Sequence, residues 1–174
     1  MPPRSRGALV IDYLESDNTS RDHAHHVLKN GNEYQGFTLV FGTVNDLYYC
    51  SNRSKRSEQI KPGIHGLSNH LFNEGSRKVR KGTESLHKLL SGPDSIYAEE
   101  LFLLLQDRTL ERQSKITVVK ESQSPIFIKG QEFGTRCSTV ILIDKDGKVL
   151  FSERTFLPEG TPEKTVEYEF VYRR

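Results

Sequence analysis

Two short segments of the sequence carry polar side chains that could line a reaction cleft. Asn69 follows a candidate strand at a glycine-rich bend, in Gly63-Ile64-His65-Gly66-Leu67-Ser68-Asn69. An asparagine amide is the kind of donor that lines an oxyanion hole. Arg136 opens an apolar run, where a guanidinium could clamp a carboxylate through two hydrogen bonds. Turn chemistry for Asn69 and a surface ion pair for Arg136 are the competing interpretations.

A thiol site is a further candidate, because Cys50 could pair with His65 or His70 as nucleophile and base. Activation of a cysteine needs an electropositive and accessible setting, whereas a cysteine on a buried strand is usually inert. The sequence therefore favours a structural role for Cys50. With only Cys50 and Cys137, and no metal-binding spacing between them, free thiols in a reducing compartment are expected.

Two motifs resemble parts of metal sites. Three histidines lie on one predicted helix: His23, His25 and His26. Their spacing could supply two ligands to one ion, but no third ligand is obvious, so a polar helix face is the favoured interpretation. Asp144-x-Asp146-Gly147 resembles half of a calcium loop, yet Thr155 stands where the bidentate glutamate should be. A hairpin turn is the better interpretation, and no metal site is predicted.

The clearest amphipathic helix is predicted over residues 77–90, with apolar residues on one face and basic residues, from Arg77 onward, over the rest. Its basic face could hold a phosphate or an anionic lipid. No glycine-rich loop precedes the helix at P-loop spacing, so a solvated face is favoured.

Composition narrows the class of protein. The chain has 174 residues, 34% of them apolar, and a net charge of +2, which gives no case for a nucleic-acid binder. No run approaches the roughly 18–20 apolar residues of a membrane helix, and the basic start has no apolar stretch behind it. A cytoplasmic α+β protein of one domain is expected.

The predicted elements begin with helices and end in an antiparallel meander. Helices are expected at 7–14, 19–30, 77–90 and about 95–106, and strands at 36–42, 47–50, 64–67, 125–129, 137–143, 148–156 and 166–172. Residues 51–59 are predicted as a polar loop and residues 107–124 as a mobile surface loop, although 116–119 could add a short strand. The almost continuous apolar run Cys137 to Ile143 is typical of a central strand buried on both faces. So few strands surround it that the fold is expected to lack its beginning.

Several segments together resemble one family. They are Gly36-Phe37-Thr38-Leu39, Pro62-Gly63 with Gly66-Leu67-Ser68-Asn69, Arg77-Lys78, Gly134-Thr135-Arg136, and the stretch from Thr139 to Arg154 that contains Asp146-Gly147 and Phe151-Ser152-Glu153-Arg154. In this order they resemble the NRDE family, whose best-known members are the transport and Golgi organisation proteins. The resemblance covers nearly the whole chain.

The resemblance implies a partial four-layer αββα sandwich of N-terminal-nucleophile-hydrolase type, lacking its opening strands. Complete members begin with Met-Cys, and that cysteine could act as nucleophile. This chain begins Met-Pro-Pro-Arg. The resemblance therefore implies a chain with no catalytic residue, in which Asn69 and Arg136 are the remnant of a cleft. A full-length form could be an amide or thioester hydrolase.

The function implied by the resemblance is intracellular trafficking: Golgi organisation, protein secretion and handling of haem or a lipid metabolite. His65, His70 and Arg77 are the residues expected to contact such a ligand. Haem would be cargo, and no cofactor is required. The expected compartment is the cytoplasm, with Golgi or mitochondrial association. A protein partner is expected to cover the bare sheet edge, and a non-functional shortened isoform is the remaining alternative.

Overall fold

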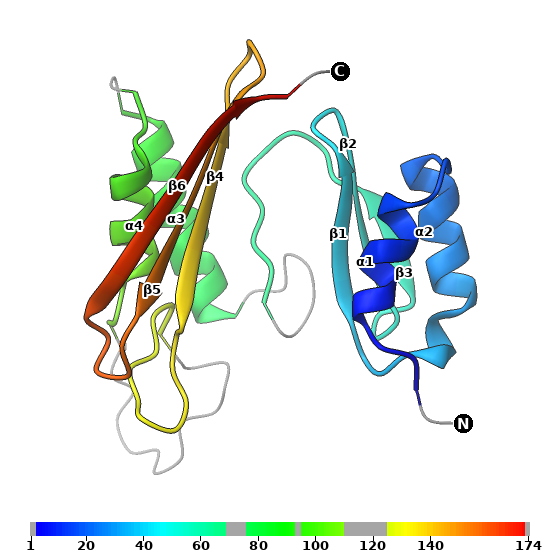
Figure 1. Cartoon of the computed structure of the whole chain (residues 1–174), viewed down its shortest axis with the longest axis horizontal. Helices are drawn as coiled ribbons and strands as arrows, with labels where there is room; N and C mark the ends of the chain where they lie inside the picture. The colour runs from blue at the N-terminus through cyan, green and yellow to red at the C-terminus, as the bar shows by residue number, and fades with distance from the viewer. Residues whose placement is uncertain (1–2, 69–75, 93–94, 110–124, 173–174) are drawn as a thin grey trace. The chain divides into compact units, whose positions relative to one another are not determined.

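The computed structural model describes residues 3–68, 76–92, 95–109 and 125–172. The chain forms two compact units, Met1–Glu74 and Gly75–Arg174, and each combines two α-helices with a three-stranded antiparallel sheet in its described part (Figure 1). The predicted α+β class is confirmed. The single-domain organisation stays a prediction, and each unit is described by itself.

The first unit begins with two helices and continues into a sheet. Its elements are α1 (Gly7–Leu14), α2 (Ser20–Lys29), the 3₁₀ turn η1 (Gly31–Glu33), β1 (Thr38–Thr43), β2 (Asp46–Ser51) and β3 (Arg56–Gln59). The strands pair in the order β1-β2-β3. The predicted capping start of α2 is confirmed, because the Thr19 hydroxyl accepts a hydrogen bond from the Asp22 backbone N–H at 3.1 Å.

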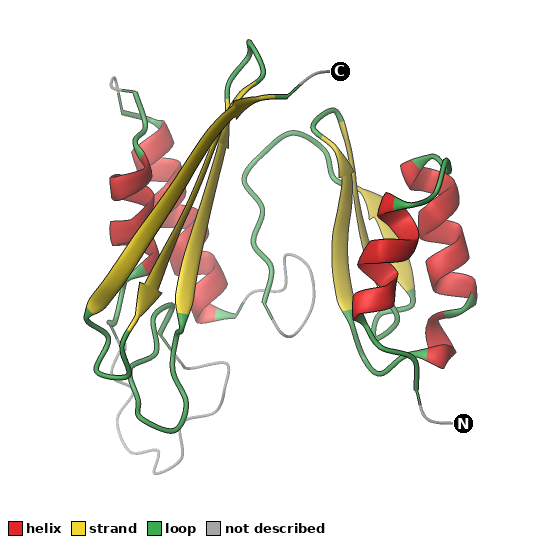
Figure 2. Ribbon diagram, viewed as in Figure 1, coloured by secondary structure: helices red, strands yellow, loops and turns green. Residues whose placement is uncertain are grey.

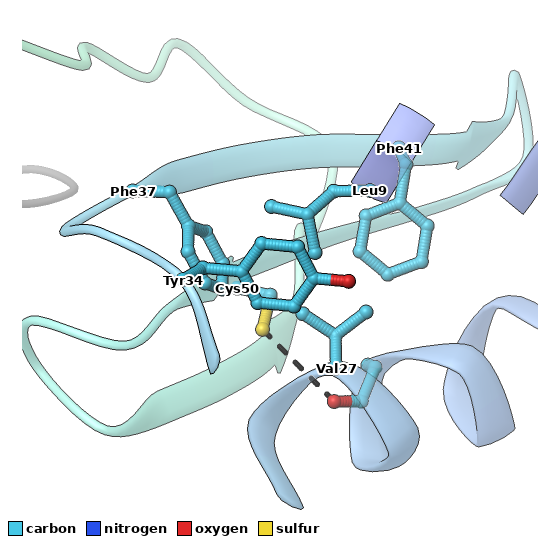
Figure 3. Packing of buried hydrophobic residues seen from close by; sticks show 7 residues of the cluster. Leu9, Val27, Tyr34, Phe37, Phe41 and Cys50 are labelled. Carbon is cyan, nitrogen blue, oxygen red and sulfur yellow. Dashed lines mark hydrogen bonds between the residues drawn. The ribbon is translucent and has the colours of Figure 1, made fainter. Parts of the chain in front are cut away.

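The core of this unit lies between the helices and one face of the sheet (Figure 3). Leu9 comes from α1, Ala24 and Val27 from α2, and Phe41 and Cys50 from β1 and β2. Register explains the sheet's contribution, because Phe41 lies opposite Tyr48 and Leu39 opposite Cys50, which places both pairs on one face. Each large apolar side chain buried here stabilises the unit by about 1.5–3 kcal/mol.

The second unit contains α3 (Arg77–Leu90), α4 (Ala98–Leu105), β4 (Cys137–Ile143), β5 (Lys148–Phe156) and β6 (Pro162–Val171). The strands pair in the order β4-β5-β6, and both helices lie on one side of the sheet (Figures 1 and 2). The N–H of Tyr97 donates to the Glu100 carboxylate at 2.9 Å and fixes the first turn of α4. Phe102, Phe127, Val140 and Phe156 are buried in this unit.

The structure corrects the expected place of Cys137–Ile143. Among the described strands, β4 is an edge strand and β5 is central. Burial alternates along β4, since Ser138 and Val140 are buried whereas Ile141 is 57% exposed. The prediction of burial on both faces was wrong because the exposed positions of β4 are also mostly apolar, so the sequence shows no alternation.

Three further strand assignments were wrong. Residues 64–67 form no strand, and the predicted polar loop at 51–59 contains β3 instead. A tight turn through Lys55, whose φ is 52°, folds the chain back so that Ser57 pairs with Cys50. Residues 125–129 form a loop, because the N–H of Phe127 donates to Asp107 rather than to a strand. Residues 107–109 are likewise loop, and the remainder of the predicted mobile loop lies outside the described residues, as does the short strand expected at 116–119.

Candidate functional site

The residues expected to line a cleft or contact a ligand divide between the two units. Asn69 and His70 lie outside the described residues. His65 is in the loop after β3, where its Nε2 atom is 2.7 Å from the Lys61 carbonyl oxygen. Arg77 is the first residue of α3, and Arg136 is an exposed residue directly before β4. The positions of His65, Arg77 and Arg136 are thus established only within their own units. The cleft that Asn69 and Arg136 were expected to line stays a prediction.

Arg136 contributes its backbone to the fold. Its carbonyl oxygen accepts a hydrogen bond from the N–H of Phe156 at 2.9 Å, which continues the β4–β5 ladder by one residue. The expected surface ion pair is not formed with any described residue, so its side chain is available at the surface of the second unit. An exposed guanidinium can bind a carboxylate or phosphate, but it is weakly oriented for catalysis.

Cys50 is fully buried in the core of the first unit. Its sulfur lies 3.9 Å from the Ala24 carbonyl oxygen on α2 (Figure 3). Burial raises the pKa of the Cys50 thiol to about 11. The favoured structural role is supported by this setting, since the thiol stays protonated at neutral pH. Cys137, in contrast, is exposed on β4.

The three histidines of α2 do not converge on one point. His25 is exposed, and the Nε2 atom of His26 lies 3.1 Å from the Asn30 amide nitrogen. His23 points inward instead, with a 2% exposed side chain whose ring centroid lies 4.9 Å from that of Tyr13. Among the described residues no group of three or more His, Cys, Asp or Glu side chains could hold a metal ion.

His23 makes the stability of the first unit depend on pH. Burial, with a smaller contribution from His26, lowers the pKa of His23 below its ordinary value of 6.5, and its Nε2 atom has no hydrogen-bond partner among the described residues. An unfolded chain therefore takes up a proton at His23 before the folded chain does. Stability is complete above pH 6.5 and falls as the pH drops toward the lower pKa of the folded state, by up to about 1.4 kcal/mol per pH unit.

The measurement is urea denaturation between pH 5 and pH 8, following amide exchange in α2. We expect His23→Gln to reduce the slope of stability against pH in this range. The exposed His25→Gln is the matched control and should leave the slope unchanged. Equal slopes in the wild type and His23→Gln would show that the buried ring does not control the pH response.

The Asp144–Gly147 segment is a turn between β4 and β5, as predicted. One oxygen of the Asp144 carboxylate accepts hydrogen bonds from the N–H groups of Asp146 at 2.9 Å and Lys148 at 2.8 Å. Gly147 has a φ of 80°, which favours glycine because it has no Cβ. The carboxylate therefore serves the turn and not a calcium loop.

Lys81 on the basic helix α3 has a structural partner. The Lys81 ammonium lies 2.5 Å from the Asp107 carboxylate and also contacts Thr109, linking α3 to the segment that follows α4. Burial raises the pKa of Asp107, but hydrogen bonds from Lys81 and Thr109 outweigh it and bring the pKa to about 2. The basic face of α3 was predicted to be solvated, but Lys81 on this helix forms an ion pair with Asp107. The Lys81 ammonium is therefore already paired with a carboxylate and is a poor candidate for binding an external anion.

Two polar residues with clear roles were missed by the sequence reasoning. Asn52, directly after β2, bonds to several backbone groups of the 31–37 segment. Arg154 on β5 makes two hydrogen bonds to Glu99 of α4 and lies over the Phe102 ring. An asparagine after a strand indicates a turn, and Arg154 lies in one of the segments that resemble the family. Neither pattern predicts which distant residue the side chain contacts.

The fold and its polar contacts define a class: an α+β protein in which the side-chain contacts of Asn52, Lys81 and Arg154 join helices, turns and strands. Comparison with known families goes further. The model of the family described as Transport and Golgi organisation 2 matches residues 1–158. The chain belongs to this family, which confirms the resemblance read from its sequence segments.

Curated relatives agree with the family match. The chain is 32% identical to a Bos taurus protein named Transport and Golgi organization protein 2 homolog, over 96% of this chain and 68% of the relative. It is 27% identical to the Mus musculus and Homo sapiens homologues, in each case over 97% of this chain and 68% of the relative. In the described part of the chain, no helix has the length and apolar character required to cross a membrane.

Proposed function

We propose that this chain acts in transport and Golgi organisation as a binding protein rather than as an enzyme. The observation that carries the proposal is the family match over residues 1–158. Relatives named for transport and Golgi organisation align with at least 96% of the chain, so the similarity extends through both units.

The chemistry of the described residues supports a binding role. With its pKa raised to about 11, Cys50 would carry roughly one thiolate per ten thousand thiols at pH 7. The His65 ring is hydrogen-bonded to the backbone of its own loop, and the Asp144 carboxylate is occupied by turn N–H groups. These candidate reactive groups are used in holding the fold together, which favours recognition over catalysis.

Complementation of cells that lack their own family member tests the proposal. Expression of this chain should restore the secretion rate of a reporter protein and the normal form of the Golgi. Asn52→Asp is expected to destabilise the first unit by disrupting the contacts of Asn52 with the 31–37 segment, so it should restore less. The exposed Asn45→Asp serves as the matched control. Failure of the wild-type chain to restore secretion, at an expression level equal to that of an active homologue, would refute the trafficking role.

The absence of catalysis needs a separate assay on the purified protein. We expect no turnover of acyl amides or thioesters above the rate of a buffer blank. Turnover that is lost in Asn69→Ala, or in Cys137→Ser with its exposed thiol removed, would instead establish a hydrolase.

The finer expectations stay predictions. They include the four-layer αββα sandwich, haem or a lipid metabolite as cargo, ligand contacts by His65, His70 and Arg77, and cytoplasmic residence with Golgi or mitochondrial association. Titration of haem into the purified chain tests directly whether haem is the cargo, because ligation by a histidine shifts the Soret band.

A further inference from the structure

The two edges of the β4-β5-β6 sheet differ in their protection against pairing with another strand. Figure 1 shows β4 and β6 as its outer strands. β6 begins with Pro162 and carries charges at Glu163, Lys164, Glu167 and Glu169. β4 has no charge and no proline along Cys137–Ile143, and its register with β5 has no irregularity. Charge, proline and bulges are the usual means of protecting an edge, so β6 is protected and β4 is not.

Among the described residues, one set of backbone hydrogen-bonding groups of β4 has no partner strand. The Asp144 N–H donates to the Lys148 carbonyl, and the Phe156 N–H donates to the Arg136 carbonyl. Because hydrogen-bonded pairs alternate along an antiparallel ladder, even-numbered residues from 136 to 144 direct their backbone groups toward β5. The backbone groups of Cys137, Thr139, Ile141 and Ile143 therefore point outward from the sheet edge.

The outward groups of β4 are complementary to those of a second β4 in the antiparallel direction. With Val140 opposite Val140 of the copy, Thr139 faces Ile141 and Cys137 faces Ile143, all outward-directed residues. This register places hydrogen-bonding groups opposite one another without a slip. Most of the residues that it pairs are β-branched, and no like charges meet across it, so the cross-strand pairs are favourable.

We propose that β4 pairs with β4 of a second copy of this chain, about a twofold axis at Val140. The β4-β5-β6 sheets of the two copies then form one continuous sheet. The same-face neighbours Ile141 and Ile143, 57% and 43% exposed, gain cross-strand partners in this arrangement. The uncharged β1 edge of the first unit is less suitable, since it is one residue shorter than β4 and Gly42 near its end has a φ of 136°, outside the range of ordinary strand residues. A contact made mainly by one strand is small, so the dimer should be concentration-dependent.

Sedimentation equilibrium of the full chain, from low to high micromolar concentration, tests the proposal. The wild type should shift from the 19.9 kDa monomer toward twice that mass. Ile141→Pro removes an outward N–H without removing a β4–β5 hydrogen bond, so it should fold and stay monomeric. Ile141→Val keeps the N–H and should dimerise like the wild type. A wild type that is monomeric throughout, or a folded Ile141→Pro that still dimerises, overturns the proposal.

Disulfide trapping tests the register independently of proline tolerance. In a Cys137→Ser background, a tagged Thr139→Cys chain should crosslink to an untagged Ile141→Cys chain, since directly opposite Cα atoms lie within disulfide range. Thr139→Cys with Ile143→Cys is the off-register control and should crosslink much less. Preferential crosslinking of the control pair, or protection of the Ile141 amide from exchange in the monomer, would refute pairing with a second copy.

Discussion

Replacing Asn52 by aspartate is expected to lower the free energy of unfolding of the first unit by about 3 kcal/mol. The Asn52 amide nitrogen lies 2.9 Å from the Gly31 carbonyl oxygen, and 3.4 and 3.3 Å from those of Tyr34 and Gln35. Its side-chain oxygen accepts from the Phe37 N–H at 2.9 Å. Aspartate keeps this acceptor but directs a negatively charged oxygen at carbonyl oxygens, so a set of donors becomes a set of repulsions.

The measurement for Asn52→Asp is urea denaturation followed by amide exchange in β1 and β2, which reports on the first unit alone. Asn45→Asp makes the same chemical change in the exposed turn between these strands and should alter stability by less than about 0.5 kcal/mol. Asn52→Ala should lower the free energy of unfolding by an amount between those of Asn52→Asp and Asn45→Asp, because it removes the hydrogen bonds without adding a charge. Equal stability of both aspartate variants would contradict the role assigned to Asn52.

Local features were predictable where one short segment contains both partners of an interaction. The Thr19 cap of α2 and the Asp144 turn were both identified, since the bonds span only a few residues. The position of β4 was not, because an edge strand with an apolar exposed face and a central strand have the same composition. β3 was missed for the opposite reason: it is polar, and its pairing with β2 decides its structure.

The candidate site was predictable only as a set of residue types. His23 differs from His25 and His26 in burial, and only packing against Tyr13 and Phe41 makes that distinction. The contacts of Asn52 and Arg154 were also beyond the sequence, since their partners are distant along the chain. Whether Asn69 and Arg136 approach each other depends on tertiary arrangement, and Asn69 lies outside the described residues.

Arg154→Met is expected to lower the free energy of unfolding of the second unit by about 2 kcal/mol. The guanidinium donates to the two carboxylate oxygens of Glu99 at 3.1 and 2.6 Å, and its Nε donates to the Thr165 hydroxyl at 3.0 Å. It also lies 4.2 Å from the centre of the Phe102 ring. The Arg154 side chain is only 13% exposed, but that of Glu99 is 61% exposed. Water therefore screens the ion pair, and the expected loss of stability includes the contacts of Arg154 with Phe102 and Thr165 as well as the pair with Glu99.

The variants of Arg154 should follow a definite order. Methionine retains the apolar stem but loses every polar contact, whereas Arg154→Lys retains the charge and should cost less, because an ammonium cannot form the two-pronged contact with Glu99. Arg136→Met is the matched control and should have little effect, since Arg136 is exposed and forms no ion pair with a described residue. Equal destabilisation by Arg154→Met and Arg136→Met would contradict the assignment.

The effect of Arg154→Met should also depend on pH. Hydrogen bonds from Arg154 lower the pKa of Glu99 below its ordinary value of 4.5. The ion pair therefore contributes fully above that value and is lost as the pH falls through the lower pKa of the folded state. Chemical denaturation of both proteins should show a stability difference that is constant near neutral pH and shrinks in acid. A difference that persists unchanged below the pKa of Glu99 would assign the loss to the Phe102 and Thr165 contacts, which have no titrating carboxylate.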